Sequence, residues 1–451
     1  MTPMQLRFGR ALPWRRCFSS TAPRGQIKDI TELPDRIHPA YQETRHNDLL
    51  ALQWPSPPRN VLLTKKDRAP DVTESVVEYA KHIHSTYPSV SLIFEPHVAN
   101  ELHEAFSFPI YTTPKERDVA TALYRKKVDL TCTLGGDGTI LHASSLFATS
   151  KRVPPILSFS MGTLGFLGEW KFKEYKRAFR EVYMSGAGAG YGSTLLGDNE
   201  DAKAPQNSVS TPTTTDHPDS SPTTTPNGWS AIRGKSMGPT RGARVLLRNR
   251  LRVGVYAADG SPLTPSPTTT TSPSGAVYAM NEVIIHRGRD THLAVVEVSV
   301  GGRFLTEAVA DGMIISTPTG STAYSLSAGG SIVHPLVSSL LLTPICPRSL
   351  SFRPLVLPAH APITLRLSEK NRGREVEVSV DGVRRSQGVG VGMEVRVWGE
   401  EIRDGEGKWM GGVPSVVRGG GGADGGPGGE DHWVGGLNGL LKFNYPFGED
   451  G

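Results

Sequence analysis

One glycine-rich turn in this chain carries an acidic residue that could act on a phosphate group. The turn follows an apolar run and precedes the apolar segment 140–147, which predicts a strand–turn–helix junction. Glycines let backbone amides approach an anion, and a helix N-terminus favours negative charge. A carboxylate at such a site can accept a proton from an attacking hydroxyl or help to hold a metal ion. The alternative is a turn with a purely structural role. The glycine-rich turn consists of Gly135, Gly136, Asp137, Gly138 and Thr139.

A second glycine turn, residues 162–167, follows the next apolar run. Gly162 again permits close approach of a ligand, and the ring of Phe166 could pack on a base or a nicotinamide. The alternative is a structural turn with Phe166 in the core. No G-x-x-x-x-G-K-S/T sequence occurs, so a P-loop mechanism is not supported. A G-x-G-x-x-G match at 420–425 lies in low-complexity sequence with no preceding strand, and we interpret it as accidental.

Asn281 and Glu282 form a polar pair inside the apolar run 277–285, which we interpret as one strand. Polar side chains in such a run must find hydrogen-bond partners. An amide can read the edge of an adenine, and a carboxylate can accept from ribose hydroxyls. The alternative is a buried structural pair.

The densest polar stretch of ordinary complexity is Thr317–Gly330, which follows Asp311-Gly312 and a predicted strand at 313–316. Its many hydroxyl groups resemble a helix N-terminus with several capping residues, suited to a polar ligand. Tyr324 offers a ring that could stack on that ligand.

The elements around these motifs indicate two kinds of fold. Between residues 59 and 186, apolar runs at 61–63, 90–94, 128–134 and 153–159 alternate with amphipathic stretches, which predicts a Rossmann-like parallel sheet with helices. From 243 to 410 the apolar period is two, with Gly-rich turns, which predicts a mostly antiparallel β-sandwich. The fold class is therefore an α/β N-terminal domain followed by a β-sandwich domain.

The remaining segments are interpreted from their composition. Gly and Pro account for 85 of 451 residues, many of them in Ser/Thr/Pro-rich or Gly-rich stretches. We interpret 187–242 and 261–274 as disordered insertions, 411–432 as a Gly-rich linker, and 433–447 as a segment that packs back on the body.

The net charge of +5 lies entirely in residues 1–26, which contain five arginines and no Lys, Asp or Glu. The segment is also rich in Ser and Thr and lacks an apolar core, so we predict a disordered mitochondrial transit peptide and a matrix location rather than a secretory signal. The alternative is a basic tail without an address. Because the remaining residues sum to zero, we expect no nucleic-acid partner, and no run of 18 apolar residues indicates a membrane span. The three cysteines have no metal-ligand spacing.

Taken in order, these motifs resemble the NAD kinase family. The GGDGT turn is shared with diacylglycerol and sphingosine kinases, whereas TPTGSTAYSLSAGG at 317–330 is typical of NAD kinases. Segments 160–170 and 437–444 are similar to the fungal mitochondrial branch of NADH kinases. The resemblance covers residues 60–184 and 243–447, excluding the insertions.

The resemblance implies transfer of phosphate from ATP to the 2′-hydroxyl of the adenosine ribose of NADH or NAD⁺, in a cleft between the domains. It makes Asp137 the proton acceptor, and Mg²⁺ is expected with ATP, with no dedicated metal site in the protein. It also implies a homo-oligomer. The residues implied to contact nucleotide are Gly135, Gly136, Gly138, Thr139, Gly162, Phe166, Asn281, Glu282, Asp311, Thr322, Ala323, Tyr324 and Ser327. The alternatives are a lipid kinase that shares the glycine turn and a nucleotide-sensing protein without turnover.

Overall fold

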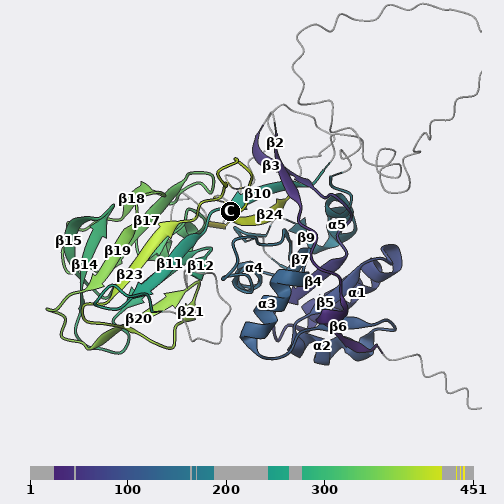
Figure 1. Cartoon of the computed structure of the whole chain (residues 1–451), viewed down its shortest axis with the longest axis horizontal. Helices are drawn as coiled ribbons and strands as arrows, with labels where there is room; N and C mark the ends of the chain where they lie inside the picture. Colours follow the sequence, from purple (N-terminus) through teal and green to yellow (C-terminus); the bar gives the residue numbers. More distant parts are fainter. Residues whose placement is uncertain are drawn as a thin grey trace, which may run out of the picture.

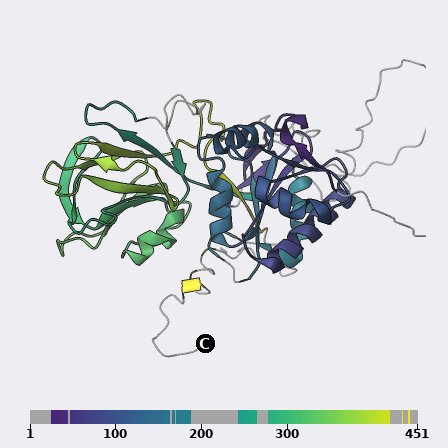
Figure 2. The same ribbon diagram turned by 90° about the horizontal axis from the view of Figure 1, so that it is seen from below.

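The computed structural model describes residues 25–44, 47–162, 165–168, 170–186, 242–263 and 277–418, with Trp433, Leu437, Leu440 and Leu441. An α/β lobe and a β-sandwich lie beside each other, as two perpendicular views show (Figures 1 and 2). The predicted fold class is confirmed. The predicted transit peptide, both Ser/Thr/Pro-rich insertions and the Gly-rich stretch fall mainly outside the described residues.

The α/β lobe is built on an eleven-stranded sheet in the order β1-β6-β5-β4-β7-β8-β24-β10-β3-β2, with β9 beside β8. The strands from β1 to β24 along this order are parallel, and β24, β10, β3 and β2 pair antiparallel. Every residue of β4, β7 and β8 is buried, as expected for central parallel strands covered on both faces. The strands are β1 (Ile27–Asp29), β2 (Ala40–Thr44), β3 (Asn47–Gln53), β4 (Asn60–Lys65), β5 (Ser91–Phe94), β6 (Ile110–Thr112), β7 (Leu130–Gly135), β8 (Ile156–Ser160), β9 (Trp170–Lys171), β10 (Arg244–Arg248) and β24 (Val413–Val417).

Helices cover both faces of this sheet. Side chains of α1, α2 and α5 pack with Val61 and Leu63 of β4 in one buried cluster. Side chains of α3 and α4 pack with Leu62, which points to the opposite face because side chains alternate along a strand. The helices are α1 (Pro70–Thr86), α2 (Pro96–Leu102), α3 (Arg117–Lys127), α4 (Asp137–Ser145) and α5 (Tyr175–Tyr183). Among the described residues, no helix has the length and apolar character needed to cross a membrane.

The sandwich consists of two antiparallel sheets, one in the order β12-β11-β23-β19-β14-β15 and one in the order β18-β17-β16-β13-β20-β21, with β22 beside β20. Buried and partly exposed residues alternate along β11, β14 and β19, so one face of each strand enters the shared core. The strands are β11 (Leu251–Tyr256), β12 (Val277–Ala279), β13 (Glu282–His286), β14 (Ala294–Val300), β15 (Arg303–Ala310), β16 (Gly312–Ser316), β17 (Ser339–Ile345), β18 (Leu355–Pro358), β19 (Ile363–Leu367), β20 (Glu375–Val380), β21 (Val383–Arg384), β22 (Val389–Gly390) and β23 (Glu394–Gly399).

Three predicted boundaries were wrong. Residues 244–256, at the start of the predicted β-sandwich domain 243–410, form two strands in different lobes, because β10 joins the α/β sheet while β11 joins the sandwich. The predicted linker 411–432 begins with β24, which lies between β8 and β10 in the α/β sheet. The run 277–285 breaks at Met280 and Asn281, so that β12 and β13 belong to opposite sheets of the sandwich.

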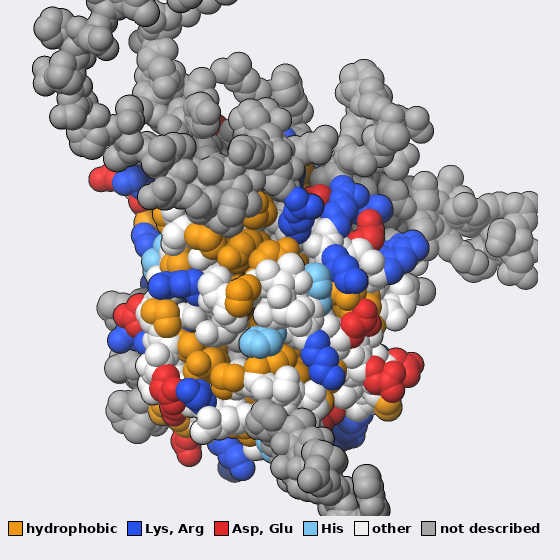
Figure 3. Space-filling model, turned by 90° about the vertical axis from the view of Figure 1, so that its right-hand side faces the viewer, with side chains coloured by type: hydrophobic (Ala, Val, Ile, Leu, Met, Phe, Trp, Pro, Cys, Tyr) orange, Lys and Arg blue, Asp and Glu red, His pale blue; other side chains and the backbone are white. Residues whose placement is uncertain are grey.

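The surface of the α/β lobe farthest from the sandwich carries charges of both signs. Lys and Arg side chains lie among Asp, Glu, His and apolar side chains there (Figure 3). This mixture agrees with the zero net charge of residues 27–451.

A buried ion pair joins the two lobes. Arg250 lies between β10 and β11, and its guanidinium contacts Glu400 through two hydrogen bonds, Nε–Oε2 at 2.8 Å and Nη2–Oε1 at 2.5 Å. Both side chains are 1% exposed. The same guanidinium donates to the carbonyls of Phe147, Ser150 and Lys151, just beyond the end of α4. One side chain therefore fastens α4 to the crossing between the lobes.

We expect Arg250→Met to lower the free energy of unfolding by about 3–5 kcal/mol, because Glu400 would remain buried without its counter-charge. The matched control is Lys408→Gln, which breaks the Lys408–Glu406 pair, whose side chains are 74% and 75% exposed. That change should cost less than about 1 kcal/mol. Urea unfolding of both variants measures the difference, and equal midpoints would contradict the role assigned to Arg250.

Candidate functional site

Asp137 is the first residue of α4, directly beyond the carboxyl end of β7. The predicted strand–turn–helix junction is therefore confirmed. Its glycines have different roles in the structure. A Cβ on Gly135 would overlap the hydroxyl of Thr139, so this glycine serves packing. A Cβ on Gly136 or Gly138 would meet nothing within 4 Å. These two exposed residues leave open space at the helix N-terminus, where backbone amides can receive phosphate oxygens.

The second glycine turn holds the carboxylate of Asp137. The backbone N–H of Phe166 donates to Asp137 Oδ2 at 3.0 Å, and that of Leu167 donates to Oδ1 at 3.2 Å. A Cβ on Gly165 would overlap the same carboxylate. Sequence reasoning assigned this turn to the ligand and missed that it orients Asp137. The turn therefore fixes the direction in which the carboxylate faces.

Gly162 and Phe166 are both accessible enough to contact a ligand. Gly162 is exposed, and a Cβ there would meet nothing within 4 Å. Phe166 is half-buried and lies outside the buried clusters, whereas its neighbour Leu167 belongs to one of them. Leu167 rather than Phe166 thus anchors the turn in the core.

The break between β12 and β13 is built around Asp381, a residue that the sequence analysis did not single out. Its carboxylate accepts from the backbone N–H groups of Met280 at 2.7 Å, Asn281 at 2.7 Å and Glu282 at 3.1 Å. Asp381 has φ of 47°, in the left-handed region that Asp tolerates in turns. These three bonds replace the ladder that a continuous strand would make, which explains why the predicted strand divides here.

Four buried polar atoms near this break have no hydrogen-bond partner among the described residues. They are Asn281 Oδ1, Glu282 Oε2, Ser316 Oγ and Thr319 Oγ1. Glu282 pairs with Ser316 across β13 and β16, so these two residues share one end of the strand pair. Burial, together with the nearby charge of Asp381, raises the pKa of Glu282 to about 7. Because buried polar groups are normally paired, such a set indicates a place that a polar ligand completes.

Packing brings this break against the helix that carries Asp137. Met280 is fully buried in the same cluster as Ile140 of α4 and Leu167 of the second turn. The N–H of Tyr278 donates to the carbonyl of Ala148, just beyond α4, at 2.7 Å. The motifs at 135–139, 162–167 and 281–282, which are far apart in the sequence, thus meet at the junction of the lobes.

The hydroxyl-rich segment divides into a structural part and an exposed part. Thr317 Oγ1 donates to Met280 O at 2.7 Å, Ser321 Oγ donates to Pro318 O at 2.6 Å, and Ser325 Oγ bonds Thr343 Oγ1 at 2.9 Å. These three hydroxyls shape the loop, whereas the sequence analysis associated the hydroxyl groups of this stretch with a polar ligand. The 3₁₀ turn Thr319–Thr322 is buried except at Thr322, and the accessible side chains belong mainly to the short helix α7 (Tyr324–Ser327).

Of the residues predicted in this part, Tyr324 is 40% exposed and Ser327 is also exposed. Thr322 and Ala323 are half-buried, and Thr322 Oγ1 donates to Thr319 O at 3.3 Å. The ring of Tyr324 is therefore accessible for stacking.

Asp311 does not join the other predicted residues within one chain. It precedes β16, whose register places Gly312 opposite His286 and Ser316 opposite Glu282. Asp311 is thus about 14 Å or more from the Glu282 end, at roughly 3.4 Å per residue. Its carboxylate accepts from Arg287 Nε at 2.6 Å. The side chain of Asp311 therefore forms an ion pair with Arg287 and is not part of the cluster around Asn281.

Gly165→Ala should lower the free energy of unfolding by about 1–3 kcal/mol, because its methyl group would overlap the Asp137 carboxylate. Gly168→Ala is the control, since a Cβ there lies 3.5 Å from Ile140 Cδ1, an ordinary contact. In an Asp137→Ala background the Gly165→Ala penalty should shrink. Urea unfolding of the four variants completes the cycle, and an unchanged penalty would show that the turn does not depend on Asp137.

Comparisons with known proteins agree with this geometry. The family model described as ATP-NAD kinase N-terminal domain matches residues 60–187, and the one described as ATP-NAD kinase C-terminal domain matches residues 280–399. The chain is 37% identical over 434 residues to a Schizosaccharomyces pombe protein named NADH kinase pos5, mitochondrial, covering 94% of this chain and 87% of the relative. It is 33% identical over 455 residues to the Saccharomyces cerevisiae protein named NADH kinase POS5, mitochondrial, covering 94% and 89%.

A solved structure gives the same result. The crystal structure of yeast NADH kinase complexed with NADH aligns with a TM-score of 0.70 at 32% identity, over 96% of this chain and 99% of that one. The chain belongs to the NAD kinase family.

Proposed function

We propose that this protein transfers the γ-phosphoryl group of ATP to the 2′-hydroxyl of the adenosine ribose of NADH or NAD⁺, giving NADPH or NADP⁺. The observation that carries the proposal is the set of buried, unpartnered polar atoms at Asn281 and Glu282, packed against the helix that begins with Asp137. The relatives named NADH kinases, and the yeast structure that holds NADH, support the same substrate class.

The acceptor side of the reaction follows from these groups. The side-chain amide of Asn281 can pair with the edge of the adenine, and the Glu282 carboxylate can accept from the ribose hydroxyls. The aromatic ring of Tyr324 and the hydroxyls of Thr322 and Ser327 are accessible to the rest of the dinucleotide. Such contacts hold the 2′-hydroxyl toward Asp137, whose carboxylate is fixed by the second glycine turn.

The chemical step is an in-line displacement. Asp137 accepts the proton of the 2′-hydroxyl as its oxygen bonds to the γ-phosphorus, while the bond from that phosphorus to the bridging oxygen breaks and ADP leaves. Backbone amides at Gly136 and Gly138 can stabilise charge on the phosphoryl oxygens. Asp137 therefore accepts the proton, and the helix N-terminus stabilises the charge on the phosphoryl group.

We propose that Mg²⁺ arrives as part of the donor, MgATP. Among the described residues, no group of three or more His, Cys, Asp or Glu side chains is placed to hold a metal ion. Bound with ATP, Mg²⁺ neutralises the phosphates and orients the transferred group. The phosphate oxygens would then supply most of its ligands.

Asp137→Asn should reduce ATP-dependent formation of NADPH from NADH by about 10²–10⁴-fold, because an amide cannot accept the proton. The Kd for NADH, measured by fluorescence titration, should change little. The control is Asp259→Asn in an exposed turn of the sandwich, which should match the unmodified protein. Residues 19–451 are the form to assay.

Retained activity in Asp137→Asn would remove Asp137 from the proton transfer. Phosphorylation of diacylglycerol or of a sphingoid base, with none of NADH or NAD⁺, would instead establish the lipid kinase alternative. Tight dinucleotide binding with no product from any nucleotide donor would establish a sensor.

We also propose that the enzyme is a homo-oligomer. The edge strands β15 and β18, at the end of the sandwich away from the α/β lobe (Figure 1), expose Phe304, Leu305 and Val356. Exposed apolar side chains on strand edges favour association with another chain. Sedimentation equilibrium of the purified protein tests this, and a monomer at micromolar concentration would contradict it.

The protein is mitochondrial, as its two fungal relatives are, and we propose the matrix as its compartment. The Arg-rich, acid-free segment 1–26 supports this proposal. Residues 1–30 fused to a fluorescent reporter should carry it into mitochondria and protect it from protease after the outer membrane is ruptured. Replacing Arg7, Arg10, Arg15 and Arg16 by Gln should leave the reporter in the cytosol. Digestion of the unmodified fusion in ruptured mitochondria would contradict the matrix assignment.

A further inference from the structure

Two side chains of helix α4 hydrogen-bond to other segments, among the residues that the structure describes. Asp137, the first residue of the helix, accepts from the second glycine turn. The other is His142, whose Nε2 lies 3.0 Å from Oε1 and 2.9 Å from Oε2 of Glu95. At a rise of about 1.5 Å per residue, His142 lies about 8 Å from Asp137 along the helix axis. The helix is therefore held at its first residue and again at its second turn.

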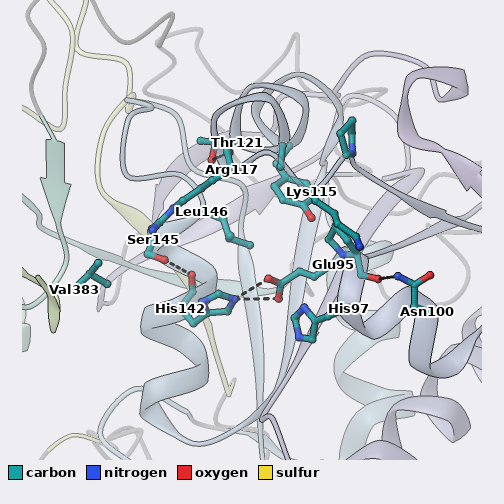
Figure 4. A pocket seen from close by; sticks show the side chains of 14 residues that line it. Glu95, His97, Asn100, Lys115, Arg117, Thr121, His142, Ser145, Leu146 and Val383 are labelled. Atoms are coloured by element: carbon teal, nitrogen blue, oxygen red, sulfur yellow. Dashed lines mark hydrogen bonds and ion pairs between the residues drawn. The ribbon is translucent and has the colours of Figure 1, made fainter. Parts of the chain in front are cut away.

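The carboxylate of Glu95 depends on this one contact. Glu95 immediately precedes α2, but its side chain makes no capping hydrogen bond to that helix. Within the described part of the chain, His142 is its only hydrogen-bond partner, and Figure 4 shows the imidazole turned toward the carboxylate at the border of a cavity. The Glu95 side chain is 11% exposed, whereas that of His142 is 46% exposed. A carboxylate buried to this extent is costly without a partner, so Glu95 holds the imidazole in place.

The Glu95–His142 pair connects α4 to a distant part of the sheet. Glu95 directly follows β5, three of whose four residues are buried, so its backbone is anchored in the core. His142 belongs to the helix that follows β7. Because β5 and β7 lie on opposite sides of β4, the pair spans the carboxyl end of β4. The position of α4 is thereby fixed relative to three neighbouring strands.

The pair restrains rotation of α4 about its own axis. Five residues separate Asp137 from His142, which places the two side chains about 140° apart around the helix. Hydrogen bonds on two sides of a helix oppose rotation, whereas apolar packing has no preferred direction. Arg250 binds carbonyl groups beyond the last turn of α4, so it does not restrain the second turn in this way.

The strength of the pair depends on pH. The hydrogen bond from Glu95 raises the pKa of His142, the charge of Asp67 acts in the same direction, and burial and Arg117 oppose them. The pair is therefore charged below the raised pKa and loses the imidazolium charge as the pH rises through it. A charge-assisted hydrogen bond is roughly twice as strong as a neutral one, so the pair weakens in alkaline solution. The titratable side chains around His142 are Asp67, Glu95, His97, Lys115 and Arg117.

We propose that Glu95 and His142 are positioning residues for phosphoryl transfer, because together they hold α4 in the rotation at which Asp137 faces the reacting groups. The proposal rests on the kinase function proposed above. Neither residue has to touch a substrate for this role. A small rotation of α4 would move both the proton acceptor and the amides of Gly136 and Gly138, and a misplacement of about 1 Å can lower a rate by about 100-fold.

The test compares the unmodified protein with His142→Gln, which keeps an N–H donor but carries no charge. The measurement is kcat for NADPH formation at saturating ATP and NADH, between about pH 6 and about pH 10. At the acidic end, the unmodified protein should be about 3- to 10-fold faster than the variant, because the charged pair is the stronger one. The ratio of the two rates should fall toward one as the pH rises and His142 loses its charge. The Kd for NADH should stay within about twofold, since the acceptor site is unchanged.

His97→Gln is the matched control. His97 lines the same cavity and pairs with Asp67 at 3.1 Å, but these two side chains are 55% and 68% exposed. An exposed pair contributes little, so this variant should follow the unmodified protein at every pH. Glu95→Gln should also be slower at the acidic end. In the double variant Glu95→Gln/His142→Gln the two losses should not multiply, because both changes weaken a single interaction.

A ratio that stays constant across the pH range, with NADPH formed normally, would overturn the positioning role and leave the proposed function standing. Losses that multiply in the double variant would also overturn the role, since the two residues would then act separately. So would loss of NADH binding in either Gln variant, because the pair would then maintain the fold as a whole. Absence of NADPH formation by the unmodified protein would contradict the proposed function, and the positioning role with it.

Discussion

The arrangement of this protein depends on one guanidinium group. Arg250 crosses between the lobes, pairs with Glu400, and binds the carbonyl groups that follow α4. Asp137, the proposed proton acceptor, is at the other end of that helix, so Arg250 fastens the helix that carries it. A cation there also complements the negative end of the helix dipole. Removing two charges from water is costly, and the multiple hydrogen bonds of Arg250 offset that cost.

Two further contacts order the site. In each, backbone amides from a distant segment hold the carboxylate of an acidic side chain. Asp137 accepts from Phe166 and Leu167, and Asp381 accepts from the break that carries Asn281 and Glu282. Each bond joins segments that are far apart in the sequence. The groups proposed to face the ligand are therefore held in place by the protein itself, which reduces the ordering needed for reaction.

The sequence was informative where local patterns decide structure. The buried apolar runs predicted β4, β5, β7 and β8, and the glycine turn predicted the start of α4. It could not show that β24 completes the α/β sheet, because Val413–Val417 finds its partners in β8 and β10, which lie far away in the chain. Nor could it show that Asp381 would divide an apolar run into two strands.

The most direct measurement is a crystal structure of the enzyme with NADH and a non-hydrolysable ATP analogue. The account predicts that the 2′-hydroxyl oxygen of the adenosine ribose lies about 2.6–3.2 Å from a carboxylate oxygen of Asp137. The γ-phosphate should lie at the amides of Gly136 and Gly138, on the opposite side of that hydroxyl. An adenosine ribose that directs its 3′-hydroxyl to Asp137, or that lies away from Asn281 and Glu282, would contradict the account.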